Sequence, residues 1–139
     1  MPKIENKWDS LYDPGKQTWF TKLEERAINW YFSRMFGKTI LSVSEIKSGK
    51  IFEPGCGSGM TCAQFAQDGF DITLMDLSPN ALKKALTTFE NFGQSCKFTI
   101  GDLFNLPFPD EEFDVVFNQG VMEHFKIAGI SPDAGIQEM

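Results

Sequence analysis

Apolar and polar residues follow one another in blocks along most of the chain, and the blocks have the lengths of strands and helices. Short apolar runs predict strands at residues 50–53, 71–76, 96–100 and 113–118. Helical patterns lie between them, one from Met60 to Asp68 and one from Pro79, where Ser78 is a suitable N-cap. Strands that alternate with helices in this way predict an α/β fold with parallel strands and right-handed helical crossovers.

The run from Phe113 to Phe117 is apolar at consecutive rather than alternating positions. This pattern is typical of a strand that is covered on both faces, so we expect this strand to lie inside the sheet.

The region before the first strand predicts an N-terminal helical extension. From Thr18 to Phe36, apolar residues recur at helical spacing, and Gly37 is a candidate C-cap. The residues of this stripe are Trp19, Leu23, Ala27 and Trp30. We expect the stripe to pack on the core rather than cover a ligand. The aromatic residues of segment 8–12 leave both interpretations open, with a slight preference for packing. We therefore expect one domain, 1–139, with a helical region at 1–48 and a core at 49–139.

Composition limits the classes of function. The 139 residues are 42% hydrophobic and 23% charged, as in a soluble globular domain. No leader-like segment or membrane span of roughly 20 apolar residues is present in the sequence, so we expect a cytoplasmic protein. The net charge of −6 argues against general nucleic-acid binding. Cys56, Cys62 and Cys96 lack paired spacing with one another or with His124, so neither a disulfide nor a metal site is expected.

The most specific motif is the glycine-rich sequence Glu-Pro-Gly-Cys-Gly-Ser-Gly from Glu53 to Gly59, between a predicted strand and a predicted helix. Glycine adopts positive φ and lets the backbone approach a ligand, while the first N–H groups of the helix face it. The motif therefore predicts a nucleotide-binding loop, although a tight structural turn has the same requirement.

Two details of the motif limit the chemical class of its ligand. A dinucleotide fingerprint requires glycine at the position of Met60, so a nicotinamide or flavin dinucleotide is disfavoured. The carboxylate of Glu53 would repel a pyrophosphate but accept hydrogen bonds from an ammonium group. We therefore expect a ligand with positive charge near the loop.

Polar residues lie at the ends of all four predicted strands: Glu53, Asp76 and Asn118 are the last residues of three strands, and Asp102 lies just past Ile100. In a doubly wound sheet the ligand lies beyond these ends, and clustered carboxylates repel one another unless a cationic or donor-rich group lies among them. Asp76 follows Glu53 by 76 − 53 = 23 residues, close to the roughly 20-residue offset at which an acid binds ribose. We expect Asp76 to bind the 2′ and 3′ oxygens and to exclude a 2′-phosphate. The alternative is a local turn into Ser78.

Four ordered blocks carry a family resemblance over about residues 50–125: Ile51–Gly59, Leu74–Pro79, Gly101–Phe108 and Phe113–Val116. They resemble the class I S-adenosylmethionine-dependent methyltransferases, especially small-molecule enzymes such as the quinone-biosynthesis methylases. The resemblance implies a Rossmann-like, doubly wound parallel sheet with helices on both faces. It also implies S-adenosyl-L-methionine as the cofactor, S-adenosyl-L-homocysteine as the product, and a small-molecule methyl acceptor.

The same resemblance implies a set of cofactor-binding residues: Glu53, Gly55, Cys56, Gly57, Ser58, Gly59, Asp76, Leu77, Asp102, Leu103 and Asn118. The first six, together with Asn118, would hold the methionine end. Asp76 would bind the ribose, and Leu77 would pack on the adenine. Asp102 would accept from the adenine amino group, and Leu103 would cover the ring.

The implied reaction is in-line displacement of the methyl group from the sulfonium by an acceptor nucleophile. A sulfonium is already a good leaving group, so positioning supplies much of the acceleration. A general base is needed only if the acceptor must lose a proton, and the candidates are His124 and Glu123, shortly after Asn118. For the histidine, a packed or capping role is the alternative.

Two departures from the family pattern affect the prediction. Nucleic-acid and protein N-methylating branches carry Asn or Asp, two prolines and an aromatic where this chain has residues 118–121, Asn-Gln-Gly-Val. Base and glutamine amino groups are thus disfavoured as methyl acceptors, and carbon, oxygen and small-amine acceptors stay open.

The family sheet also has seven strands, whereas this chain ends after the fourth. We expect a fragment without its C-terminal strands, in which another chain pairs the free edge of strand 113–118. A catalytically silent subunit that stabilises or activates a partner methyltransferase is the alternative function.

Overall fold

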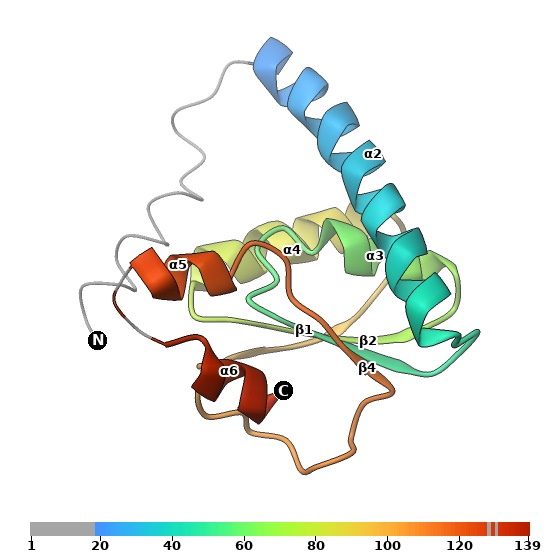
Figure 1. Ribbon diagram of the computed structural model, residues 1–139. Helices are drawn as coiled ribbons and strands as arrows, with labels where there is room; N and C mark the ends of the chain where they lie inside the picture. Colours follow the sequence, from blue (N-terminus) through green and yellow to red (C-terminus); the bar gives the residue numbers. More distant parts are fainter. Residues whose placement is uncertain (1–18, 128, 130) are drawn as a thin grey trace.

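The computed structural model describes residues 19–127, 129 and 131–139 of the chain (Figure 1). Its elements, in chain order, are α2 (Trp19–Ser44), β1 (Lys50–Pro54), α3 (Met60–Gln67), β2 (Asp71–Asp76), α4 (Pro79–Asn91), β3 (Lys97–Ile100), β4 (Val115–Val116), α5 (Met122–Ile127) and α6 (Asp133–Glu138). The strands form one parallel sheet in the order β3-β2-β1-β4. The predicted parallel α/β architecture is confirmed.

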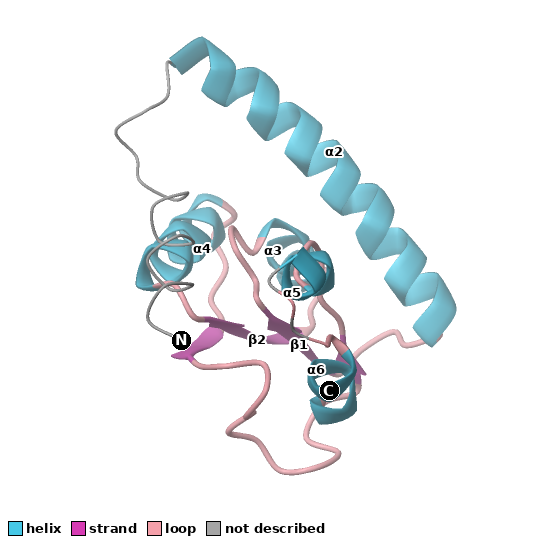
Figure 2. Cartoon of the chain, turned by 60° about the vertical axis from the view of Figure 1, so that its left-hand side comes forward, coloured by secondary structure: helices cyan, strands magenta, loops and turns pink. Residues whose placement is uncertain are grey.

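Helices lie on both faces of this sheet. α3 and α4 contact β2 from one face, and α2 packs against α3. α6 lies on the opposite side of the sheet, as Figures 1 and 2 show from two directions. The strand order reverses at β1, since β2 lies on one side of it and β4 on the other. This reversal creates a switch point between β1 and β4, the position where doubly wound sheets bind ligands.

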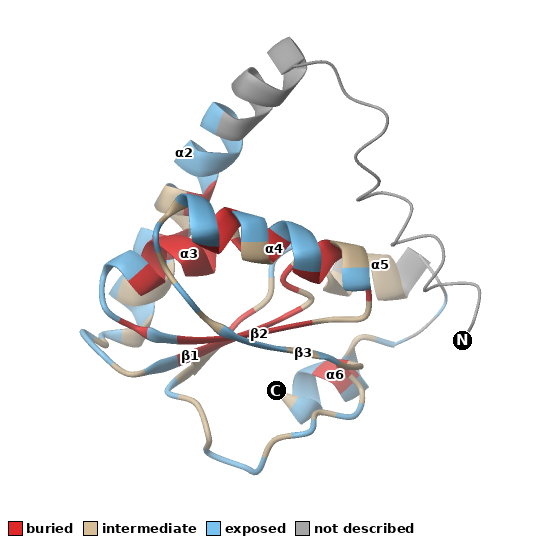
Figure 3. Ribbon diagram, turned by 180° about the vertical axis from the view of Figure 1, so that it is seen from behind, coloured by how far each residue is buried: buried red, intermediate tan, exposed pale blue. Residues whose placement is uncertain are grey.

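The main core fills the space between the sheet and the helices α3 and α4 (Figure 3). Ile51, Ile72 and Leu74 of the strands pack there with aromatic side chains of the two helices. Four consecutive residues are buried in each of β1 and β2, so these central strands are covered on both faces. On the other face Phe52 stacks on Phe113, with ring centroids 4.8 Å apart.

Local sequence signals locate most elements well. β1, β2, β3 and α3 begin and end within one residue of the predicted bounds. α4 begins at Pro79 as predicted, and the Ser78 hydroxyl accepts a hydrogen bond from the N–H of Ala81 at 3.1 Å. The predicted N-cap is therefore confirmed. No helix in the described part of the chain is long and apolar enough to cross a membrane.

The N-terminal helix differs from its prediction at the C-terminal end. Gly37 does not end the helix but lies inside α2, which continues to Ser44. A Cβ atom at this position would lie 3.1 Å from the ring of Phe65 in α3, so the glycine permits the two helices to approach closely. This packing outweighs the cost of a glycine inside a helix, about 1 kcal/mol.

The expected packing of the aromatic stripe is wrong at Trp30, which is 47% exposed, and Ala27 is also exposed. Gln64 of α3 donates to the backbone carbonyl oxygen of Trp30 at 3.2 Å, so α3 meets the backbone of α2 at this level while the Trp30 side chain stays exposed. The side chains of Trp19 and Leu23, and segment 8–12, lie outside the described residues.

The fourth strand is shorter than predicted and comprises Val115–Val116. Among the described residues it pairs with β1 and lies at the edge of the sheet, so the expected position inside the sheet is wrong for this part of the chain. Phe113 lies before the strand, where its ring stacks on Phe52 and packs edge-on against Phe108.

Candidate cofactor-binding site

The loop from Glu53 to Gly59 crosses the end of β1 at the switch point of the sheet. Gly55, Gly57 and Gly59 have φ angles of 72°, 54° and 62°, in the left-handed region that favours glycine. A Cβ atom at Gly59, the N-cap of α3, would also lie 3.1 Å from Leu74. The backbone of the loop therefore requires these glycines, whether or not a ligand binds.

Hydrogen bonds fix this loop to the end of β2. The N–H groups of Gly55 and Cys56 donate to the carbonyl oxygen of Met75 at 2.7 and 3.1 Å. The N–H of Gly57 donates to Oδ2 of Asp76 at 2.9 Å. The loop therefore reaches Asp76 through its backbone.

Asp76 joins two turns through its carboxylate. Oδ2 accepts from Gly57, and Oδ1 accepts from the N–H of Ser78 at 2.9 Å. The expected alternative, a local turn into Ser78, is thus present in the structure. Burial raises the pKa of Asp76, and the backbone N–H groups of Ser78, Gly57 and Leu77 act in the opposite direction. A carboxylate has about four lone-pair sites, so acceptor capacity for ribose hydroxyls remains.

Glu53 is the least ordinary residue of the site. Its side chain is only 4% exposed, and Oε2 has no hydrogen-bond partner among the residues that the structure describes. Burial raises the pKa of this carboxyl group to about 8, a hydrogen bond with the Cys62 thiol lowers it, and the charge of Asp76 raises it. Leaving a buried acceptor without a partner costs roughly 1–3 kcal/mol, so packing alone does not account for this acid.

Cys56 and Ser58 are the two side chains of the loop between the glycines. Cys56 is buried, and burial, with the charges of Glu53 and Asp76, raises the pKa of its thiol well above the ordinary value. Such a thiol stays protonated and is a poor nucleophile. Ser58 is half-buried.

The end of β3 lies beside the end of β2. Ile100 is in register with Asp76, and the N–H of Gly101 donates to the carbonyl oxygen of Asp76 at 3.2 Å. Asp102 follows directly, and its Oδ1 accepts from the N–H of Phe104 at 3.0 Å in a tight turn. The structure thus brings the second and third expected acids to one edge of the sheet.

The two expected adenine-contacting leucines differ in environment. Leu77 is half-buried in the turn between β2 and α4. Leu103 is buried, and a Cβ atom at Gly135 of α6 would lie 3.2 Å from it, so α6 packs closely on this leucine.

The segment after β4 lies against the glycine loop. A Cβ atom at Gly55 would meet the side chain of Val121 at 2.5 Å, so the start of α5 lies beside the loop. Asn118 is half-buried, and its side-chain amide donates to the sulfur of Met139 at 3.1 Å. His124 lies in α5 with a half-buried side chain, whereas the side chain of Glu123 lies outside the described part.

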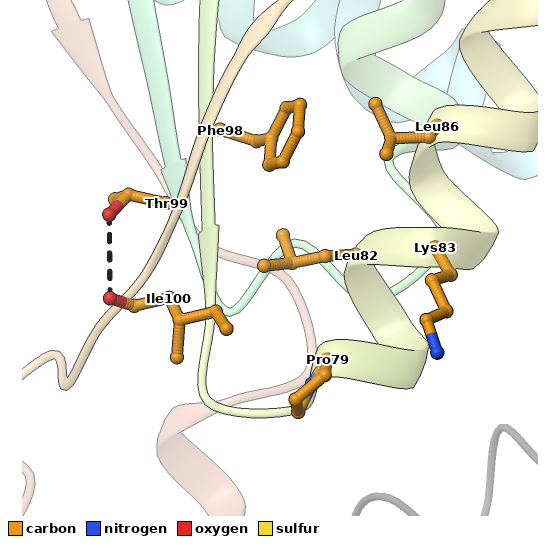
Figure 4. Close-up of a pocket in the computed structure, with 7 residues that line it drawn as sticks. All are labelled: Pro79, Leu82, Lys83, Leu86, Phe98, Thr99 and Ile100. Atoms are coloured by element: carbon orange, nitrogen blue, oxygen red, sulfur yellow. Dashed lines mark hydrogen bonds between the residues drawn. The ribbon is translucent and has the colours of Figure 1, made fainter.

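A groove of about 460 Å³ lies between α4 and β3, and the sequence reasoning missed it (Figure 4). Its lining residues are Pro79, Leu82, Lys83, Leu86, Phe98, Thr99 and Ile100. In Figure 4 the apolar side chains of Leu82, Leu86 and Phe98 face one another across the groove, while Thr99 points away. The sequence signals that could have revealed this groove are the i, i+4 pair Leu82 and Leu86 in the helix and the alternating residues 98–100 in the strand. None of the expected cofactor residues is among those that line it.

Comparison with known proteins defines the class. Residues 52–139 match the model of a family described as a methyltransferase domain. The chain belongs to this family, and its sheet is the Rossmann-like sheet of class I S-adenosylmethionine-dependent methyltransferases. The family resemblance and the fold predicted from the sequence are confirmed.

Individual relatives agree with this assignment. The chain is 28% identical over 119 residues to norajmaline N-methyltransferase of Rauvolfia serpentina, covering 84% of this chain and 41% of the relative. It is 36% identical over 69 residues to 2-methyl-6-phytyl-1,4-hydroquinone methyltransferase of Synechocystis, covering 49% of this chain and 21% of the relative. The chain spans about two fifths or less of the length of the curated relatives it matches.

Solved structures show the same fold. Magnesium protoporphyrin IX methyltransferase from Synechocystis, determined with bound S-adenosylhomocysteine (SAH), superposes with a TM-score of 0.65. The match covers 96% of this chain and 59% of that protein at 20% identity. At this identity the similarity concerns the fold.

Proposed function

We propose that this chain binds S-adenosyl-L-methionine at the loop from Glu53 to Gly59 and is the cofactor-binding portion of a methyltransferase that acts on a small molecule. The observation that carries the proposal is Oε2 of Glu53, which is buried without a hydrogen-bond partner in the described part of the chain. The ammonium group of the cofactor would supply the missing donor. When bound, this cofactor supplies a methyl group on a positively charged sulfur that a nucleophile can displace.

The chain's own residues then divide the binding between them. Glu53, the backbone from Gly55 to Gly59, and Asn118 hold the methionine end. Asp76 accepts from the ribose hydroxyls with the lone pairs that Gly57 and Ser78 leave available.

The adenine end lies at the neighbouring strand ends. Asp102, which follows β3, accepts from the adenine amino group. Leu77 and Leu103, from the turns after β2 and β3, contact the ring. The hydrogen bond from Gly101 to Asp76 supports this division, because it holds the ribose and adenine residues together.

We propose a small-molecule acceptor for two reasons. The sequence of residues 118–121 differs from that of the nucleic-acid and protein N-methylating branches. Two similar proteins are named for small-molecule substrates. His124 or Glu123 serves as a general base where the acceptor must lose a proton, since α5 begins beside Gly55 of the loop. These relatives are named as enzymes, which gives no support to the alternative of a catalytically silent subunit.

We propose that residues 1–48 are a helical region and that residues 49–139 are the core of one methyltransferase domain. We also propose that another chain pairs the outer edge of β4, whose strand bonds in the described part go to β1. Light scattering that showed a monomer with β4 ordered and unpaired would contradict this pairing.

Titration calorimetry at pH 8 tests the cofactor assignment. We expect SAH to bind and NAD not to bind. Glu53→Gln removes a charged acceptor, which lowers the affinity for SAH roughly 10- to 100-fold. Glu112→Gln is the matched control, because Glu112 is half-buried and pairs with Lys50 at 2.9 Å outside the loop. NAD binding, or a Glu53→Gln variant that binds SAH as tightly as the control, would overturn the proposal.

A further inference from the structure

Helix α2 has a second apolar face, on the side turned away from α3. Ser33, Gly37 and Ile40 lie on the inner side, where the first two are buried and Ile40 packs against the core. Residues on the opposite side of the helix recur at spacings of three, four and seven positions. They form what we call the outer face: Ile28, Tyr31, Phe32, Met35, Thr39 and Val43. All six are exposed, and the five large hydrophobic ones are 51% to 80% exposed.

The fold holds α2 by its inner side and leaves the outer face uncovered. The side chain of Gln64 in α3 donates to the carbonyl oxygen of Trp30, and Phe36 packs edge-on against Phe117. Figure 2 shows α2 at the border of the molecule, with α3 and the sheet on one side of it. A surface helix normally has one apolar stripe, which faces the core. A second stripe on the outside indicates a contact with another protein.

The distribution of charge limits what this partner can be. Residues 27–37 include one charged residue, Arg34, which donates to Oδ2 of Asp68 at 3.4 Å. A helix that lies on a lipid surface needs a polar side rich in Lys and Arg, so this segment does not fit a membrane. The whole chain has a net charge of −6, and two copies can meet without strong repulsion only at an uncharged surface. The outer face is such a surface, since none of its six residues is charged.

We propose that the outer face of α2 is a homodimer interface, in which the α2 helices of two copies pack antiparallel about a twofold axis near Met35. This packing places Phe32 opposite Thr39 of the partner subunit, and Ile28 opposite Val43 of the partner subunit. Large side chains then meet smaller ones, as interdigitated helices require, whereas a parallel pair would set each Phe32 against its own copy. The hydroxyl of Thr39 donates to the carbonyl oxygen of Met35 at 3.1 Å, so its burial leaves no donor unsatisfied.

The size and composition of the outer face fit such a dimer. At about 200 Å² for a large side chain, the exposed fractions amount to roughly 600 Å² of apolar surface per copy. Two copies would then bury about 1,200 Å², the lower limit of specific interfaces. Aromatic residues and Met are enriched at interface cores, and charged residues are depleted there. We therefore expect a specific but weak dimer. The inference does not depend on the cofactor assignment, and α2 is remote in sequence from the edge of β4.

Sedimentation velocity of the full chain, from low to high micromolar concentration, tests the interface. We expect the wild type to dimerise with a micromolar dissociation constant. Met35→Glu and Met35→Lys each place two like charges beside the axis, which should weaken the dimer at least about tenfold. A mixture of the two variants places opposite charges there and should dimerise again. Phe98→Glu in β3 is the matched control, because Phe98 is as exposed as Met35, and it should dimerise like the wild type.

Recovery on mixing is the decisive result, because misfolded variants could not produce it. If circular dichroism shows that a Met35 variant is not folded, Val43→Glu mixed with Ile28→Lys replaces the pair, since both positions are exposed and face each other in the antiparallel dimer.

Four results would overturn the inference. A wild type that stays monomeric at every concentration would leave the residues before Trp19 or a different protein as the occupant of the outer face. A dimer that survives Met35→Glu, or that Phe98→Glu dissociates, would place the contact on another surface, such as the edge of β4 in the first case. Folded variants that do not dimerise on mixing would exclude the axis near Met35. None of these results bears on cofactor binding, which calorimetry with SAH measures separately.

Discussion

Raising the pH should destabilise the ligand-free protein, and the cause is the buried carboxyl group of Glu53. Its pKa is about 8 in the folded chain, compared with 4.5 for the ordinary group, because burial disfavours the charged form. Between these two values the folded protein holds a proton that the unfolded chain has released. The stabilising contribution of the protonated acid is therefore fully present below about pH 4.5 and is lost as the pH rises to about 8.

The size of the effect follows from the distance between the two pKa values. In that range the equilibrium constant for unfolding rises up to tenfold per pH unit. Over the whole range the loss is on the order of 5 kcal/mol, a large share of the 5–15 kcal/mol that stabilises a typical domain. Solvent screening reduces it little, since the side chain is only 4% exposed. Burial also raises the pKa of Asp76, which adds to the loss of stability at the lower end of this pH range.

Urea denaturation at pH 5, 6, 7 and 8 measures this dependence directly. We expect the free energy of unfolding of the wild type to fall steadily, whereas Glu53→Gln, which cannot ionise, should show a much flatter profile. Glu112→Gln removes an acid from an ion pair with Lys50 and should retain the wild-type slope. A wild-type profile that is flat, or one that Glu53→Gln reproduces, would refute the reasoning.

Two further matched pairs test the geometry of the site. Asp76→Asn loses one of two backbone hydrogen bonds and should destabilise the protein by roughly 1–3 kcal/mol. Asp71→Asn, at the other end of β2, breaks an exposed ion pair and should cost less than about 1 kcal/mol. Equal losses in thermal unfolding would contradict the bridging role of Asp76. Gly59→Ala should cost roughly 2–4 kcal/mol, from left-handed strain and a 3.1 Å contact with Leu74. Gly69→Ala has the strain but no neighbour within 4 Å and should cost roughly 1–2 kcal/mol. Equal midpoints in urea would count against the contact.

Elements with strong local signals were predictable from the sequence. β2 has its predicted bounds, Asp71–Asp76, because polar residues end a short apolar run on both sides. α4 begins as predicted because Ser78 and Pro79 favour a helix start whatever the surroundings. Gly37 was misinterpreted because its role depends on Phe65, which lies in another helix. A glycine that allows two helices to approach and a glycine that ends one look alike in sequence.

In the candidate site, too, some features could be predicted from the sequence and others could not. The fold alone brings the residues after parallel strands to one edge, so the positions of Asp76 and Asp102 could be predicted together. The burial of Glu53 Oε2 without a partner among the described residues could not be predicted, because the sequence does not show which donors pack around the end of β1.

Asp76 is fixed in one conformation before any ligand arrives. The N–H groups of Gly57 and Ser78 each hold one of its oxygens at 2.9 Å, so rotation of the carboxylate would break both hydrogen bonds. Ordering a side chain at a binding site costs roughly 0.5–1.5 kcal/mol, and here that entropy is lost when the chain folds rather than when a ligand binds. If Asp76 binds the ribose as we propose, this end of the site is preorganised, and the two adjacent hydroxyls would meet an acceptor that the backbone already holds in place.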